Sequence, residues 1–149
     1  MLKDSNDIDK RLKSFKELFR DSGIKLTHQR LEIFKEIVQS QNHPDAETVF
    51  QNVRQRIPTI SLDTVYRTLW KLKDLELIHS IGTPKESTRF DANLKQHHHF
   101  VCKVCGKMRD FYSEQLNDLQ LPDAIGELGI AKTTHVEVRG ICRDCEEKQ

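Results

Sequence analysis

The sequence has few features that would suit a membrane or an exported protein. Its 149 residues include no long run of apolar residues, so no segment is suited to cross a bilayer as a helix. The first residues are polar and lack the apolar core of a signal peptide, and we therefore expect a cytoplasmic protein with no membrane partner. Basic and acidic residues number 24 and 23, and this balance neither indicates nor excludes binding to nucleic acid.

The common enzyme signatures are also missing. The chain contains no Gly-x-Ser-x-Gly elbow, no phosphate-binding Walker loop, no His-Glu-x-x-His and no Gly-x-Gly-x-x-Gly fingerprint. We therefore predict that the protein is not an enzyme. A metal-dependent hydrolase that uses a cluster of histidine and aspartate side chains is the alternative from another functional class.

The first half of the chain predicts helices followed by a β-hairpin. Apolar residues recur at helical spacing, and Thr27 and Ser61 suit the N-termini of helices. The expected elements are helices over residues 8–22, 46–56 and 62–75, a helix that begins after Thr27, and strands over 78–82 and 87–91 joined by a turn at 83–86. This order is typical of a winged helix-turn-helix, which places its second helix in the major groove of DNA.

The helix predicted over residues 62–75 has two different faces. Val65, Leu69 and Leu72 form the stripe that we expect to be buried. The other face carries side chains of the kind that contact bases and phosphates. These side chains are Thr64, Tyr66, Arg67 and Lys71. The pattern favours DNA binding, and a small helical bundle with a solvated face is the alternative.

The second half of the chain predicts a small domain of mixed structure. Strands are expected over residues 98–101, 107–112 and 132–139, and a short helix over 122–129. The predicted fold class is therefore α+β, with a winged-helix domain over residues 1–91 and a second domain over 92–149.

The four cysteines form two pairs that predict a zinc site. The pairs are Cys102 with Cys105 and Cys142 with Cys145, with two residues inside each pair and 36 between the pairs. Two such pairs point four sulfurs at one ion in the tetrahedral arrangement of structural zinc. Four thiolates leave no position open for a substrate, so the site is expected to be structural. Separate redox pairs and free thiols are the alternatives, although reduced thiols in a cytoplasmic protein favour metal.

Three consecutive histidines precede the first cysteine pair. In a strand, His97 and His99 point to one side and His98 to the other. The groups able to join His97 and His99 are those of His43, Asp91 and Asp110. Three imidazoles and two carboxylates suit Fe²⁺ or Mn²⁺ better than structural zinc. An ion held by both halves of the chain would select one domain arrangement and so control DNA binding, whereas the alternative is a set of surface histidines.

With these segments in place, the chain resembles the ferric uptake regulator family of metal-dependent repressors over about residues 10–146. The segments that carry the resemblance are Leu26–Arg30, His43-Pro44, Thr64–Leu69, Arg89–Asp91, His97–Cys102, Cys105–Lys107 and Gly140–Cys145. The resemblance implies a winged helix joined to a dimerisation domain, so that a homodimer places two recognition helices on palindromic operator DNA. It also implies that Tyr66 and Arg67 contact bases and phosphates, that Lys25 reaches toward the minor groove, and that the four cysteines hold structural Zn²⁺.

The resemblance extends to a regulatory metal site for Fe²⁺ or Mn²⁺. The matching residues are His43, Asp91, His97, His99 and Asp110. Aspartate at both carboxylate positions is similar to the peroxide-sensing branch, in which Fe²⁺ reacts with hydrogen peroxide, a ligand histidine is oxidised and the repressor leaves DNA. His43 and His97 match the oxidised positions. With Mn²⁺ in the site, the resemblance implies a repressor that binds DNA yet responds poorly to peroxide. Peroxide is the only small-molecule substrate that we expect.

One residue of the sequence differs from the peroxide-sensing branch, and one metal site of the iron-uptake branch is incomplete. Arg67 is more similar to the iron-uptake branch, so an iron-uptake or other metal-availability repressor is the alternative function. A further metal site that iron-uptake members often carry is broken here at Gln96 and His98. His135 is accordingly expected to be a solvent-facing strand histidine.

Overall fold

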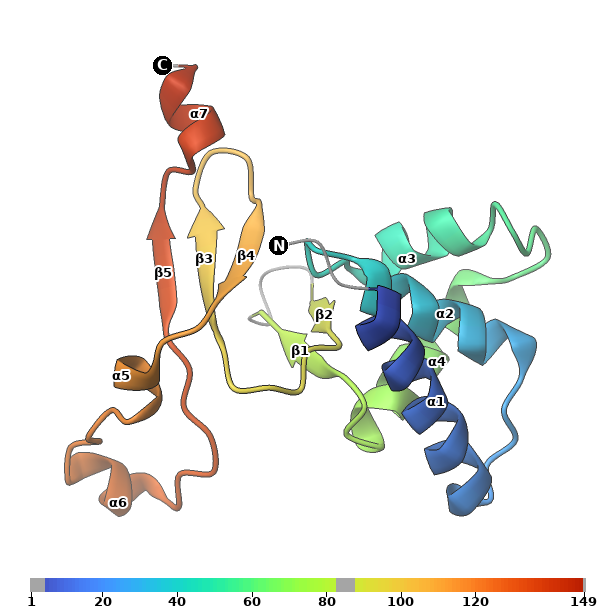
Figure 1. Ribbon diagram of the computed structural model, residues 1–149, viewed down its shortest axis with the longest axis horizontal. Coiled ribbons are helices and arrows are strands. Elements are labelled where there is room, and N and C mark those ends of the chain that lie inside the picture. The colour runs from blue at the N-terminus through green and yellow to red at the C-terminus, as the bar shows by residue number, and fades with distance from the viewer. Residues whose placement is uncertain (1–4, 83–87, 149) are drawn as a thin grey trace. The chain divides into compact units, whose positions relative to one another are not determined.

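The chain forms two compact units, Met1–Leu94 and Lys95–Gln149. The computed structural model describes residues 5–82 and 88–148, and Figure 1 shows the elements of each unit. Within these residues the first unit contains helices and a two-stranded sheet, and the second contains a three-stranded sheet with short helices. This content confirms the predicted α+β class.

The first unit has four helices in its described residues, and side chains cap the starts of three of them. The four helices are α1 (Ser5–Ser22), α2 (His28–Gln39), α3 (Ala46–Val53) and α4 (Leu62–Asp74). Thr27, Asp45 and Ser61 each accept a hydrogen bond from the backbone N–H three residues further on. Each bond satisfies one of the donors that a helix leaves unpaired at its start. The predicted starts of α2, α3 and α4 are confirmed.

Two predicted helix limits in the first unit are wrong by three residues each. Helix α1 begins at Ser5 rather than at residue 8, and Asp7 places a carboxylate near the positive end of its dipole. Helix α3 ends at Val53 rather than at residue 56, and the Ile57 N–H then donates to the Val53 carbonyl in a turn. Pro58 disfavours helical backbone at Ile57 only, so it does not account for the end at Val53, where the Arg56 N–H also donates to the Val53 carbonyl in the turn.

A buried cluster of aromatic and aliphatic side chains holds the first unit together. The Phe15 and Phe34 rings stack with centroids 4.2 Å apart, and Phe19 packs beside Phe15 at 4.7 Å. The same cluster contains Ile33, Ile37, Val38, Val49, Val53, Val65, Leu69, Leu72 and Ile78. The stripe predicted for α4 is therefore buried, and the other face of this helix is left for solvent or a partner.

The C-terminus of α4 closes with a residue in the left-handed backbone conformation. Glu76 has a φ of 59°. Its N–H donates to the Lys73 carbonyl at 2.9 Å, and the Leu77 N–H donates to the Leu72 carbonyl at 3.0 Å. These two bonds satisfy carbonyls at the helix end in the arrangement where glycine is the preferred residue.

Glu76→Gly is therefore expected to raise the free energy of unfolding by about 0.5–1 kcal/mol, because glycine adopts this conformation without the steric penalty of a Cβ atom. Urea unfolding of the zinc-loaded protein measures the change. Glu17→Gly, at an exposed position inside α1, is the matched control and is expected to destabilise the protein. A Glu76→Gly protein no more stable than the original would contradict this interpretation of the turn.

The first unit ends in an antiparallel hairpin, the wing of the winged helix. Strand β1 (His79–Ile81) pairs with β2 (Arg89–Asp91), and His79 lies opposite Asp91. Both strands lie inside the ranges predicted for them, and the pairing confirms the hairpin. The turn predicted at residues 83–86 lies outside the described residues.

The second unit is built on a three-stranded sheet. Strand β3 (His98–Cys102) lies in the centre, antiparallel to β4 (Met108–Phe111) and parallel to β5 (Glu137–Gly140). Its helices are α5 (Glu114–Asn117), α6 (Ala124–Leu128) and α7 (Arg143–Glu147). The sequence did not predict α5 and α7, because four or five residues are too few to show helical periodicity. The strand expected over 132–139 is wrong at both ends, since β5 begins at Glu137 and runs to Gly140.

The second unit buries little apolar surface. Among its described residues, the buried apolar side chains are Cys102, Met108 and Cys145. Leu128 and Ile130 are 85% and 84% exposed. A unit with so small a core needs another source of stability, such as a metal ion or a partner surface. None of the helices in the described part of the chain combines the length and the hydropathy of a membrane span.

Candidate metal centres

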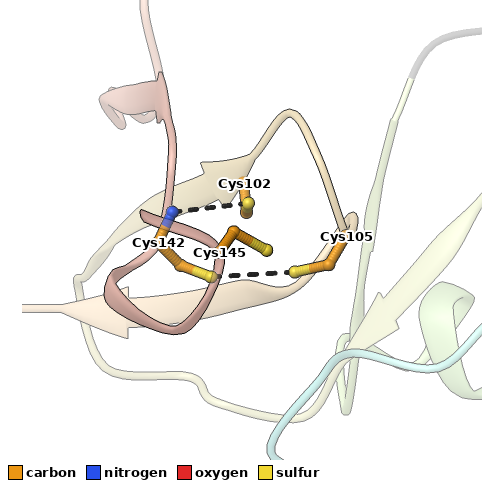
Figure 2. Close-up of side chains that lie close together, drawn as sticks. All are labelled: Cys102, Cys105, Cys142 and Cys145. Carbon is orange, nitrogen blue, oxygen red and sulfur yellow. Dashed lines mark hydrogen bonds between the residues drawn. The ribbon is translucent and has the colours of Figure 1, made fainter. Parts of the chain in front are cut away.

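The two cysteine pairs meet beside the central strand of the second unit. Cys102 ends β3, and Cys105 lies in the turn that leads to β4 (Figure 2). Parallel pairing of Cys102 with Gly140 brings the end of β5 to the same place, so Cys142 and Cys145 of the following segment face the first pair. The sulfur atoms of the four cysteines all lie within 4.8 Å of one another.

Two of the four thiols have a shifted pKa. Backbone N–H groups, first that of Cys105 and then that of Cys142, lower the pKa of Cys102 to about 6. The N–H groups of Val104 and Cys142 both lie 3.4 Å from its sulfur. Hydrogen bonding to Cys142, with burial, raises the pKa of Cys145 to about 12. One thiolate is thus formed at neutral pH, and a bound cation would replace the remaining protons.

His97, His99 and Asp110 form a second cluster within the same unit. The antiparallel pairing places His99 opposite Asp110. The Nε2 atoms of His97 and His99 are 3.1 Å apart, and Asp110 Oδ1 lies 3.7 Å from the first and 3.3 Å from the second. His97 Nδ1 lies 2.6 Å from the Lys95 carbonyl, to which it donates its proton. His97 Nε2 is therefore the acceptor nitrogen of the neutral ring, as a metal ligand must be.

The spacing of the two imidazoles fits a shared ion. Two nitrogens bound to one ion at about 2.1 Å and at a right angle lie about 3 Å apart. The observed separation of His97 Nε2 and His99 Nε2 is 3.1 Å. Both imidazoles are buried. The carboxylate of Asp110 supplies the negative charge that a buried divalent cation requires.

His98 points away from this cluster, as strand alternation predicts. Its ring is completely buried. Nδ1 accepts a hydrogen bond from the Val136 N–H at 3.0 Å, and Nε2 lies 2.8 Å from Asn117 Oδ1. Both nitrogens are thus used to hold α5 and the approach to β5 against β3. His135 is exposed and lies just before β5.

The first unit carries a cluster of its own. His43 follows α2, and its Nδ1 lies 3.4 Å from Oδ1 of Asp91 at the end of β2. The Asp91 carboxylate also accepts the Asn93 N–H at 2.8 Å, which fixes its orientation. Both His43 and Asp91 are buried. The five residues of the predicted regulatory site thus form two clusters, one in each unit, and each cluster holds one of the histidines predicted to be oxidised.

The residues predicted to contact DNA lie on or near helical N-termini of the first unit. Lys25 is exposed in the segment before α2. On α4, Thr64 Oγ1 lies 2.9 Å from Ser61 Oγ, so its hydroxyl takes part in the helix cap. Tyr66 and Arg67 are exposed, and Arg67 pairs with Asp63 at 2.9 Å. Arg67 is therefore held by an acidic neighbour that a DNA phosphate or base would have to replace.

Two supporting contacts were missed by the sequence. Lys107 forms an ion pair with Asp144 at 3.0 Å, which links the segments that carry the two cysteine pairs. Arg89 donates to the backbone carbonyl of His43 at 2.8 Å. The only sequence signal for Arg89 was its place beside Asp91, since its partner is 46 residues away.

Comparison with known proteins decides the family. The model of the ferric uptake regulator family matches residues 21–146. The chain belongs to the ferric uptake regulator family. The match covers both units and includes both cysteine pairs and all five histidine and aspartate residues of the two clusters.

Individual relatives agree with this family. The chain is 32% identical to the peroxide-responsive repressor PerR of Staphylococcus epidermidis, over 95% of this chain and 94% of that protein. In fold it is similar to the ferric uptake regulator of Helicobacter pylori, with a TM-score of 0.74 and 23% identity over 97% and 95% of the two chains. It is also similar to PerR of Streptococcus pyogenes, with a TM-score of 0.54 and 28% identity over 91% and 92%.

Proposed function

We propose that this protein is a metal-dependent transcriptional repressor that senses hydrogen peroxide through Fe²⁺-dependent oxidation of His43 or His97. The observation that supports it most is the donor set of the two buried clusters, which consists of imidazoles and carboxylates with aspartate at both carboxylate positions. The name peroxide-responsive repressor, carried by a relative that matches nearly the whole chain, points in the same direction.

The two kinds of donor set would hold different metals. Four thiolates suit Zn²⁺ in a closed tetrahedral site, and the clustered sulfurs of Cys102, Cys105, Cys142 and Cys145 fit that ion. Imidazole and carboxylate ligands suit Fe²⁺ or Mn²⁺. A closed zinc site offers no position to a substrate, so the proposal gives the protein no catalytic turnover. The cytoplasm, where thiols stay reduced, is the proposed location.

We further propose that one regulatory ion takes ligands from both clusters. His43 and Asp91 belong to the first unit, and His97, His99 and Asp110 belong to the second. An ion that binds best when all five are assembled stabilises one arrangement of the units over others. The metal would in this way set the position of α4 and so control DNA binding.

The proposed DNA-binding species is a homodimer on a palindromic operator. The second unit exposes large apolar side chains, such as Leu128, Ile130 and Val138. These side chains are suited to pack against a second copy of the chain. In the first unit, α4 buries Val65 and Leu69 and presents Tyr66 and Arg67 outward, as a recognition helix must. A two-fold dimer of such units matches the symmetry of a palindrome.

Bound Fe²⁺ would activate hydrogen peroxide for this step. In the net change hydrogen peroxide is the two-electron oxidant of the imidazole: one of its oxygen atoms is inserted into a C–H bond and the other leaves as water, so the ion supplies no net electrons. The protein holds the imidazoles for this step. The Lys95 carbonyl fixes the His97 ring through its Nδ1 proton. Loss of one imidazole donor would weaken the link between the two clusters, and the repressor would then leave its operator.

The test is mass spectrometry of anaerobically purified, Fe²⁺-loaded protein after a brief pulse of hydrogen peroxide. We expect one added oxygen atom on the peptide that contains His43 or on the peptide that contains His97, with loss of DNA binding in the same sample. Protein loaded with Mn²⁺ is the control and is expected to stay unmodified. Buried His98, whose two nitrogens are engaged by the protein, is the internal control among neighbouring histidines.

The alternative function is an iron-uptake or other metal-availability repressor. It predicts unmodified histidines after the pulse and operator binding that follows the free metal concentration alone. That outcome would overturn peroxide sensing, while the metal-dependent repressor would stand.

A further inference from the structure

The adjoining strand β2 holds the turn that presents His43. His43 has a φ of 44°, a left-handed backbone conformation that residues other than glycine rarely adopt. Such a conformation persists only where the surrounding structure maintains it. Three consecutive residues of β2 contact the turn here, namely Arg89, Phe90 and Asp91.

Each residue of β2 contacts the turn in a different way. The Arg89 guanidinium donates through Nε to the His43 carbonyl at 2.8 Å and through a second nitrogen to the Asn42 carbonyl. The Phe90 N–H donates to the Pro44 carbonyl at 3.0 Å. Three successive carbonyls of the turn are therefore bound by neighbouring residues of one strand.

The arginine also lies on the side of the strand that faces the predicted ligands. Residues two apart in a strand share a face, so Arg89 and Asp91 point the same way. Arg89 holds the backbone of His43, while Asp91 lies 3.4 Å from its ring. Burial lowers the pKa of the Arg89 guanidinium, although nearby Asp45 opposes this shift. Desolvation of a charged group is costly, and two charge-assisted hydrogen bonds to carbonyls offset that cost.

We propose that Arg89 is a positioning residue for the regulatory metal: its two-pronged contact with the Asn42 and His43 carbonyls fixes the backbone from which the His43 imidazole is presented. This inference rests on the proposed function, in which His43 is a metal ligand. A planar guanidinium reaches two carbonyls at once in a fixed geometry, whereas the single ammonium of lysine does not. The position is therefore specific for arginine and not merely for positive charge.

The test compares Arg89→Ala and Arg89→Lys with wild type in the zinc-loaded full-length protein. Mn²⁺ binding is followed by electron paramagnetic resonance, and zinc content and thermal unfolding are measured on the same samples. We expect Mn²⁺ affinity to fall by about 10–100-fold in Arg89→Ala, the usual effect of losing a residue that orients a ligand. Arg89→Lys is expected to keep the fold and still lose most of this affinity.

Arg56→Ala is the matched control. Arg56 also lies in the first unit and donates to two partners, Glu32 at 2.9 Å and Glu36 at 3.0 Å, but these pairs join α2 to the segment after α3. Its loss is expected to lower thermal stability without changing Mn²⁺ affinity. A general effect of removing a paired arginine would instead change Mn²⁺ affinity in both variants.

Two further readouts separate positioning from a merely structural role. In metal-free protein, amide hydrogen exchange at residues 42, 43, 45 and 46 and at Phe90 is expected to accelerate in Arg89→Ala and to stay unchanged in Arg56→Ala. In a His43→Ala background, Arg89→Ala is expected to cause no further loss of Mn²⁺ affinity, because the residue acts through His43.

The possible results test the role of Arg89 separately from the proposed function. Wild-type affinity in Arg89→Ala, or an equal additional loss in the His43→Ala background, would overturn the role of Arg89 and leave the proposed function intact. A wild-type protein that binds Zn²⁺ but no second ion would instead overturn the proposed function, and the role of Arg89 with it.

Discussion

Cys102→Ser is expected to release zinc and to unfold the second unit. Structural zinc contributes about 10–16 kcal/mol of apparent binding free energy in small zinc domains, and this energy is folding free energy. The second unit depends on it heavily, because its buried apolar side chains within the described residues are Met108 and two of the cysteines themselves. Backbone N–H groups also lower the pKa of Cys102 to about 6, so its loss removes a ligand that ionises readily.

Zinc content, near-ultraviolet circular dichroism and sedimentation together measure this effect. We expect a metal content near zero, a melting transition confined to the first unit, and loss of the homodimer. Val104→Ser is the matched control, since Val104 lies between the two cysteines of the first pair and is 59% exposed. A Cys102→Ser protein with full zinc and a normal transition would contradict the four-thiolate site.

The lowered pKa of Cys102 also determines the pH at which these experiments are run. The folded unit favours the thiolate more than the unfolded chain does, where the thiol has its ordinary pKa of 9.0. The resulting stabilisation is complete above that value and declines as the pH falls toward 6. Because protons compete with a metal ion for the thiolates, zinc retention is compared at one fixed pH.

Asp110→Ala is expected to leave a folded, zinc-containing protein that no longer responds to Fe²⁺ or Mn²⁺. Asp110 Oδ1 is the carboxylate oxygen that faces the Nε2 atoms of both His97 and His99. Without it, a divalent cation would meet only neutral imidazoles in the second unit. Substitution of a residue that only orients a metal ligand lowers metal affinity by about 10–100-fold. Removal of a charged ligand is therefore expected to lower the affinity for Mn²⁺ or Fe²⁺ by more than about a hundredfold.

DNA binding at fixed Mn²⁺ concentration provides the measurement, with an operator duplex selected from random DNA by the Mn²⁺-loaded wild-type protein. Asp118→Ala is the matched control, because Asp118 is an exposed aspartate of the same unit at the end of α5. We expect the control to bind DNA as the wild type does. Operator binding by Asp110→Ala that still depends on Mn²⁺ would remove Asp110 from the regulatory site.

The parts of this protein that depend on local chemistry could be predicted from its sequence. Thr27 and Ser61 indicate helix starts because their side chains satisfy backbone donors three residues away. The stripe of Val65, Leu69 and Leu72 follows from helical periodicity. The spacing of the cysteine pairs restricts what four thiols are able to bind, whatever the path of the chain between them.

Short elements and the limits of longer ones were predicted less well. Helices α5 and α7 contain four and five residues, too few for a periodic pattern. Helix α3 ends at Val53 in a turn closed by bonds to the Val53 carbonyl, and the effect of Pro58 on the residue before it does not predict that turn. Strand β5 is limited to Glu137–Gly140, the stretch over which β3 provides a parallel partner.

The sequence by itself determined the types of ligand, the helix caps and the family of this protein, because each depends on residue identity at short spacing. Only the tertiary structure decided that Arg89 holds the carbonyl of His43, since those residues are 46 positions apart. It also decided how the two predicted cysteine pairs are brought together, through the parallel pairing of β3 with β5. Contacts between distant segments depend on how strands pair and pack, and residue spacing along the chain does not contain that information.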